Sequence, residues 1–283
     1  MKKWVEKFVP EKDLFFVEEK DLSLFDEYLN GALVVPFEEF LKHSSYKQIQ
    51  MVNSYTYWNI SSKAKYVIVA HYSWITNLTE EARKDIFSIQ YKMGRGMILP
   101  LSLFPSGDSI PPDYIIREHE EKLVVIQHRM WEELPYQIKE AALLAYSQEW
   151  DSWICHDVLD DSPIHIRKYA NTHTTISGSN CLSATLFAIT AQEWILKEWV
   201  HHETFFYGLK NANYDVTNDE MRAGDVVTWI DENRVIHHAS FYIGNSLFFN
   251  KNGQTVFNPY KIIRLNELNE QWGQYRKITY RKK

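Results

Sequence analysis

Cysteine is nearly absent from this sequence, and several other residue types are scarce. Only Cys155 and Cys181 occur among the 283 residues, which excludes a fold held together by disulfides. The 10 glycines and 9 prolines are spread over the whole length, so long flexible linkers are not expected. The formal net charge is −6 and no long run of Lys or Arg occurs. A nucleic-acid partner is therefore not indicated.

Long apolar runs are also missing. The longest one, residues 181–191, is interrupted by Ser and Thr and is too short to span a bilayer. Charged residues recur near the N-terminus and leave no apolar core for a signal peptide. His201-His202-Glu203 lacks the HExxH spacing of a metal-binding helix. We therefore expect no membrane span, a cytoplasmic location, and no metal or organic cofactor. The oligomeric state stays open.

The composition is that of a folded chain with two parts. Hydrophobic residues make up 45% of it and aromatic residues 15%, which excludes general disorder. The acidic segment Asp157–Pro163 ends in proline and marks a boundary. We expect an accessory region of mixed α and β, residues 1–160, and an α+β domain, residues 161–283. In the second part the patterns predict a helix over 181–200 and strands over 225–230, 235–243, 247–250, 255–257, 261–265 and 275–280.

Cys181 lies where small polar residues give way to an apolar segment. Asn180 or Ser179 can cap a helix that begins there, which places Cys181 in the first turn. Free N–H groups and the helix dipole favour a thiolate at that position, and the same N–H groups could bind an oxyanion. The alternative is a structural cysteine packed in a core.

His238 lies in a predicted strand whose alternate residues face opposite sides. His238 and Ser240 share one side, and Ala239 and Phe241 share the other. Gly244-Asn245 turns the chain, so the returning strand can bring Asn250 to the imidazole. A histidine that acts as a base needs such a partner to fix its tautomer and direction.

Over roughly residues 165–281 the sequence resembles the NlpC-type cell-wall peptidases, a branch of the papain-like cysteine hydrolases. Gly224-Asp225-Val226-Val227 is similar to the segment that opens the first strand of that family. His238–Asn245 resembles its histidine strand, and Asn250 falls where the family places its third polar residue. Tyr169 precedes Cys181 by the spacing at which the family often has a tyrosine lining the site.

The resemblance implies a buried helix that carries Cys181 and packs on an antiparallel sheet. It implies Cys181 as nucleophile, His238 as general base and Asn250 as the residue that orients the histidine. Tyr169, Asn180 and Ser240 are the expected substrate contacts. At the position of Asn180 the family has an Asp that helps to hold a substrate amine, and the neutral Asn180 would hold such an amine less well. The expected reaction is hydrolysis of an amide or peptide bond, with cell-wall peptides as the implied substrates. Acyl transfer by the same residues and a non-enzymatic binding module are the alternatives.

Overall fold

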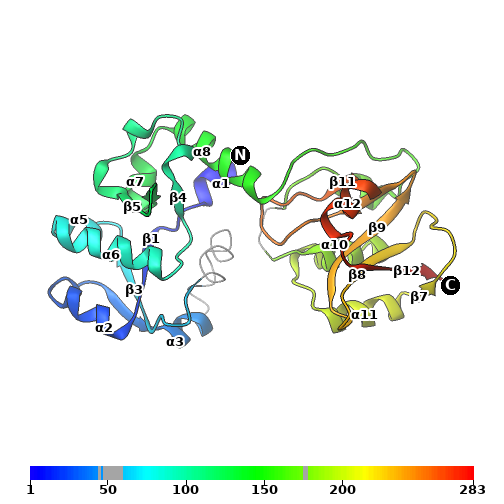
Figure 1. Cartoon of the computed structure of the whole chain (residues 1–283), viewed down its shortest axis with the longest axis horizontal. Helices are drawn as coiled ribbons and strands as arrows, with labels where there is room; N and C mark the ends of the chain where they lie inside the picture. Colours follow the sequence, from blue (N-terminus) through cyan, green and yellow to red (C-terminus); the bar gives the residue numbers. More distant parts are fainter. Residues whose placement is uncertain (44–45, 47–59, 175–177) are drawn as a thin grey trace. The chain divides into compact units, whose positions relative to one another are not determined.

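The structure, a computed structural model, describes residues 1–43, 46, 60–174 and 178–283 (Figure 1). The chain divides into two units, Met1–Glu149 and Trp150–Lys283, whereas the sequence analysis places the boundary after residue 160. The difference arises because Asp151 is fixed in the C-terminal unit by an ion pair with Lys261, whose Nζ lies 2.8 Å from Oδ1. Within the described ranges, no helix is long and apolar enough to cross a membrane.

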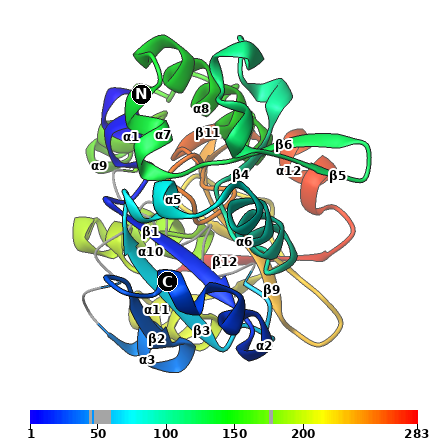
Figure 2. The ribbon, with the colours of Figure 1, turned by 90° about the vertical axis from the view of Figure 1, so that its left-hand side faces the viewer.

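The described residues of the N-terminal unit form two three-stranded antiparallel sheets with helices beside them. Strand order is β1-β3-β2 in one sheet and β4-β6-β5 in the other, and Figure 2 shows β1 beside β3. The described elements are α1 Lys2–Lys7, β1 Lys12–Val17, α2 Glu19–Leu22, β2 Leu33–Pro36, α3 Phe37–Lys42, β3 Tyr66–His71, α5 Trp74–Asn77, α6 Glu80–Lys92, β4 Ile98–Pro100, β5 Ile115–Glu118, β6 Glu121–Val125, α7 His128–Glu133 and α8 Tyr136–Trp150.

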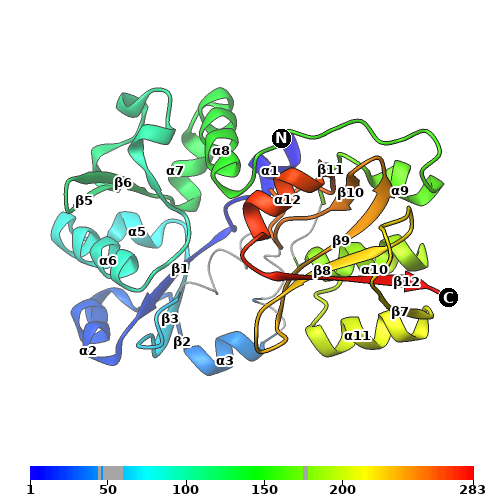
Figure 3. The same ribbon diagram turned by 45° about the vertical axis from the view of Figure 1, so that its right-hand side comes forward.

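The C-terminal unit is built on one six-stranded antiparallel sheet (Figure 3). Its strand order is β11-β10-β9-β8-β12-β7, so the predicted α+β class is confirmed. The elements are α9 Ile164–Tyr169, α10 Cys181–Thr190, α11 His202–Asn211, β7 Tyr214–Thr217, β8 Val226–Ile230, β9 Ile236–Gly244, β10 Leu247–Asn250, β11 Lys261–Arg264, α12 Leu265–Trp272 and β12 Arg276–Lys282.

Two apolar clusters cover the two faces of this sheet. On one face, Phe187 of α10 packs in a cluster with Ala239 and Phe241 of β9. On the other face, Leu268 of α12 packs in a cluster with Trp229 of β8. Alternate strand residues feed the two clusters, as expected for a sheet covered on both sides. Cys181 begins α10 on one face of the sheet, and His238 belongs to β9, a strand covered by apolar clusters on both faces.

Two predicted elements differ from the structure. The helix expected over 181–200 ends at Thr190, because Ala191 adopts a left-handed conformation with φ 57° that stops the helical hydrogen-bond ladder. The strand expected over 255–257 is a turn instead. There the side-chain Oδ1 of Asn258 accepts hydrogen bonds from the N–H and the hydroxyl of Thr255, at 3.1 and 2.7 Å. Such a local side-chain bond competes with strand pairing.

Candidate active site

Cys181 is the first residue of α10, as predicted. Asn180 caps the helix: its Oδ1 accepts from the N–H of Ser183 at 2.9 Å, and the Ser183 hydroxyl accepts from the N–H of Asn180 at 2.9 Å. This reciprocal capping box fixes where the helix begins. It also explains why a short polar segment before an apolar run placed Cys181 correctly in the first turn.

The charge state of Cys181 differs from the expectation. Burial raises the pKa of the thiol to about 11, although hydrogen bonds from the N–H groups of Ala239 and Leu182 and from its own N–H lower it. The predicted lowering of the pKa is therefore wrong for the protein without substrate. Loss of water around the sulfur outweighs the favourable dipoles at the helix end. The side chain as a whole keeps partial exposure to solvent.

His238 lies in the middle of the sheet and has no exposed surface. Its imidazole stacks on Trp272, with ring centroids 4.6 Å apart and planes 4° apart. Trp229 lies on the neighbouring strand with its ring centroid 5.5 Å away. Burial lowers the pKa of His238 to about 4, and the hydrogen bond to Asn250 opposes this shift. At neutral pH the ring is consequently uncharged.

Asn250 reaches His238 through the β9–β10 hairpin. Asn245 and Ser246 both have positive φ, 52° and 60°, which is the geometry of a two-residue type I′ turn. The returning strand then places Asn250 Oδ1 2.7 Å from His238 Nε2. The predicted contact between this amide and the imidazole is confirmed.

The other imidazole nitrogen, Nδ1 of His238, is buried and has no hydrogen-bond partner among the described residues. No hydrogen bond therefore joins it to the thiol of Cys181 in the resting structure. The sulfur nevertheless accepts from the N–H of Ala239, the residue next to His238 in β9. Cys181 packs with the apolar cluster on the α10 face of the sheet, whereas the His238 ring stacks on Trp272 on the α12 face. Thiol and imidazole therefore lie beside the same short stretch of β9 but on opposite faces of the sheet.

The three predicted substrate contacts are engaged within the protein. The hydroxyl of Tyr169 donates to Glu193 at 2.8 Å. The Nδ2 of Asn180 donates to the carbonyl of Val200 at 2.8 Å, in addition to its capping role. Ser240 is fully buried and donates to the carbonyl of Phe249 at 3.0 Å. Tyr169, at the end of α9, and Asn180, at the start of α10, are both partly exposed, whereas Ser240 is not.

Lys251 is a buried residue near the site that the sequence did not predict. It has no exposed surface, and its Nζ donates to the carbonyls of Thr255 and Asn258 at 3.0 and 2.7 Å. Burial lowers its pKa to about 7, while Asp151 and Cys181 raise it. No motif marks this lysine, and only its place directly after Asn250 could have drawn attention to it.

None of the three comparisons with known proteins, against family models, curated sequences and solved structures, gives a match. Among the described residues, no group of three or more His, Cys, Asp or Glu side chains is placed to hold a metal ion. The function must therefore be argued from the geometry around Cys181, His238 and Asn250.

Proposed function

We propose that the C-terminal unit is a cysteine hydrolase of the papain-like, NlpC type that cleaves an amide or peptide bond. One observation carries the proposal. The buried His238 presents an unpartnered Nδ1 while its Nε2 is bound to Asn250 at 2.7 Å. A buried polar atom without a partner is costly, and a general base needs such an atom free for a proton.

The proposed reaction begins with proton transfer from Cys181 to His238 Nδ1. The thiolate attacks the substrate carbonyl carbon, and the N–H groups at the start of α10 stabilise the resulting oxyanion. As the tetrahedral intermediate collapses, the C–N bond breaks and the imidazolium gives its proton to the leaving amine. His238 then takes a proton from water, the hydroxide attacks the thioester, and the acid is released with the thiol restored.

The thiol and the imidazole are both neutral before substrate binds. The pKa of Cys181 is raised to about 11 and that of His238 is lowered to about 4, so an ion pair in the resting state is unfavourable. We infer that the proton moves only when a bound substrate brings the reacting groups together. This differs from a site whose thiolate is stored in advance.

The proposed substrate is an amide or a peptide, and the sequence resemblance suggests cell-wall peptides as one class. The amide of Asn180 is committed to Ser183 and Val200. A free substrate amine would therefore need another partner. Acyl transfer by the same residues differs only in the acceptor that attacks the thioester, so product analysis separates it from hydrolysis.

The test is a screen of the whole chain against a library of N-acyl peptides and amides, with cleavage read by mass spectrometry. Cleavage should disappear in Cys181→Ala and remain in Cys155→Ala, which removes the exposed cysteine instead. Added hydroxylamine should divert product to the hydroxamate through the thioester. Cleavage that survives in Cys181→Ala would contradict the proposal. Binding of a peptide without cleavage would favour the binding module.

A further inference from the structure

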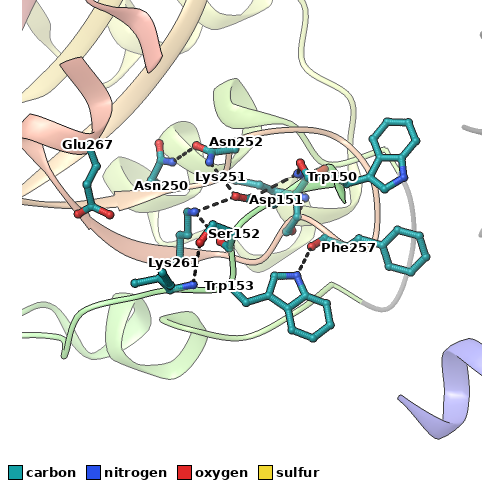
Figure 4. A network of polar contacts seen from close by, with 12 residues as sticks. Trp150, Asp151, Ser152, Trp153, Asn250, Lys251, Asn252, Phe257, Lys261 and Glu267 are labelled. Carbon is teal, nitrogen blue, oxygen red and sulfur yellow. Dashed lines mark hydrogen bonds and ion pairs between the residues drawn. The ribbon is translucent and has the colours of Figure 1, made fainter. Parts of the chain in front are cut away.

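A series of hydrogen bonds extends from His238 to a buried ion pair. Figure 4 shows its part from Asn250 through Asn252 to Asp151 and Lys261. The Nδ2 of Asn250 donates to Asn252 Oδ1 at 2.6 Å. The Nδ2 of Asn252 donates to Asp151 Oδ1 at 3.0 Å. The same carboxylate oxygen lies 2.8 Å from Lys261 Nζ, and both side chains of this ion pair are only 2% exposed. Asp151 lies outside the stretch that resembles the cysteine peptidases.

The hydrogen bonds of this series can run in only one donor-to-acceptor direction. A carboxylate accepts hydrogen bonds and cannot donate, so Asn252 must turn its NH₂ group toward Asp151. Its carbonyl oxygen then faces Asn250, which must present its own NH₂ group there. The remaining oxygen of Asn250 faces His238 Nε2 and accepts, so Nε2 carries the ring proton. Nδ1 is thereby left as the unprotonated nitrogen of the neutral ring.

We propose that Asp151, acting through Asn252 and Asn250, is a positioning residue that holds His238 as the Nε2–H tautomer and keeps Nδ1 free to accept the proton of Cys181. The consequence for catalysis rests on the proposed hydrolase function, whereas the tautomer itself does not. Asp151 never touches the reacting atoms.

The anchor is itself held firmly. Lys261 Nζ also donates to the carbonyl of Ser152 at 2.8 Å, and Asn258 Nδ2 donates to Asp151 Oδ2 at 3.3 Å. The carboxylate thus has a charged partner and two amide partners in a buried setting. Ionic hydrogen bonds of this kind are stronger than neutral ones. Asp151, which sets the direction of the hydrogen bonds, is therefore also the most strongly bound member of the series.

The test uses the whole chain and four variants. Asp151→Asn replaces the acceptor with an amide that can turn either way. Asn252→Leu breaks the chain while leaving the ion pair with Lys261 in place. The double variant Asp151→Asn/Asn252→Asp moves the carboxylate next to Asn250, where it again accepts from Nδ2. Asn258→Ala is the control, because it removes another bond to Asp151 that is not on the path to His238.

The tautomer is read from long-range ¹H–¹⁵N spectra of histidine-labelled protein, with His238→Gln identifying the His238 signals. Wild type, Asn258→Ala and the double variant should show Nε2–H alone. Asp151→Asn and Asn252→Leu should add the Nδ1–H form. With a cleavable substrate, kcat should fall in these two by roughly two- to tenfold, following the share of the wrong tautomer, with KM nearly unchanged. The double variant should recover kcat.

A single Nε2–H tautomer with unchanged kcat in Asn252→Leu would overturn the proposal. Failure of the double variant to restore the wild-type tautomer would also overturn it, because that variant keeps an acceptor at the required place. If Asp151→Asn does not fold, Asn252→Leu alone decides the matter. A shift of tautomer in a protein that cleaves nothing would leave the positioning role standing and count against the hydrolase.

Discussion

Cys181 should be a slow nucleophile in the free protein, because its pKa is raised to about 11. Roughly one molecule in 10,000 then carries the thiolate at pH 7, against roughly 3% for an ordinary cysteine with a pKa near 8.5. That ratio is about 300. A more basic thiolate is also the better nucleophile, with a Brønsted coefficient of roughly 0.4–0.5, which recovers about 13-fold. We expect Cys181 to react about 20-fold more slowly than an ordinary cysteine.

The assay is alkylation by iodoacetamide from pH 6 to pH 10, followed by peptide mass at each cysteine. Cys155 is exposed and serves as the internal comparison. Its peptide should be labelled well before that of Cys181 at pH 7, and the rate at Cys181 should keep rising up to the highest pH tested. If Cys181 is labelled first at pH 6–7, a thiolate–imidazolium pair exists in the resting protein. Desolvation of the thiol would then not control its charge state.

Three further predictions concern the histidine. The pKa of His238 falls from 6.5 to about 4 on folding, so the unfolded chain binds the extra proton between these values and stability is lost as pH falls from 6.5 to 4. The free energy of unfolding lost in this way is at most about 3.4 kcal/mol. Urea titrations at pH 7 and 4.5 should show a smaller loss of stability in His238→Gln than in wild type, and a loss like that of wild type in the neighbouring His237→Gln. Trp272→Leu removes the stacked indole and admits water, so the pKa of His238 should rise toward 6.5 in an NMR titration; an unchanged value would assign the burial to other groups. Asn250→Ala should lower kcat for a cleavable substrate by roughly tenfold or more while thermal melting shows a folded protein; unchanged turnover would remove Asn250 from its proposed role.

The hairpin that joins His238 to Asn250 could be predicted because its two strands and its turn are each marked by residues that are neighbours in the sequence. Strand alternation predicts which side of the sheet His238 faces. Gly244-Asn245 predicts a turn, and the structure places it one residue later, at Asn245 and Ser246. The short β10 strand then gave the distance along the chain. The start of α10 was equally readable, since capping depends on residues that are neighbours in sequence.

What could not be predicted depends on contacts between distant parts of the chain. The raised pKa of Cys181 results from burial of the thiol. The residues that mark a helix start in the sequence do not tell how deeply its first side chain will be buried. Asp151 appears in the sequence as one carboxylate before an acidic segment, and its partner Lys261 lies in a strand far along the chain. The stacking of Trp272 on His238 joins the end of α12 to β9. These long-range pairings have no periodic pattern, so only the folded structure reveals them.

Acylation by p-nitrophenyl acetate tests whether Cys181 is a nucleophile that depends on His238. Nitrophenol release would be followed with time, and the quenched protein would be analysed by intact mass and peptide mapping. We expect one acetyl group on Cys181 that forms and is released with turnover in wild type. It should form much more slowly in His238→Gln and be absent in Cys181→Ala. An acetyl group found elsewhere, or equal acylation of Cys181 with and without His238, would contradict this role of Cys181.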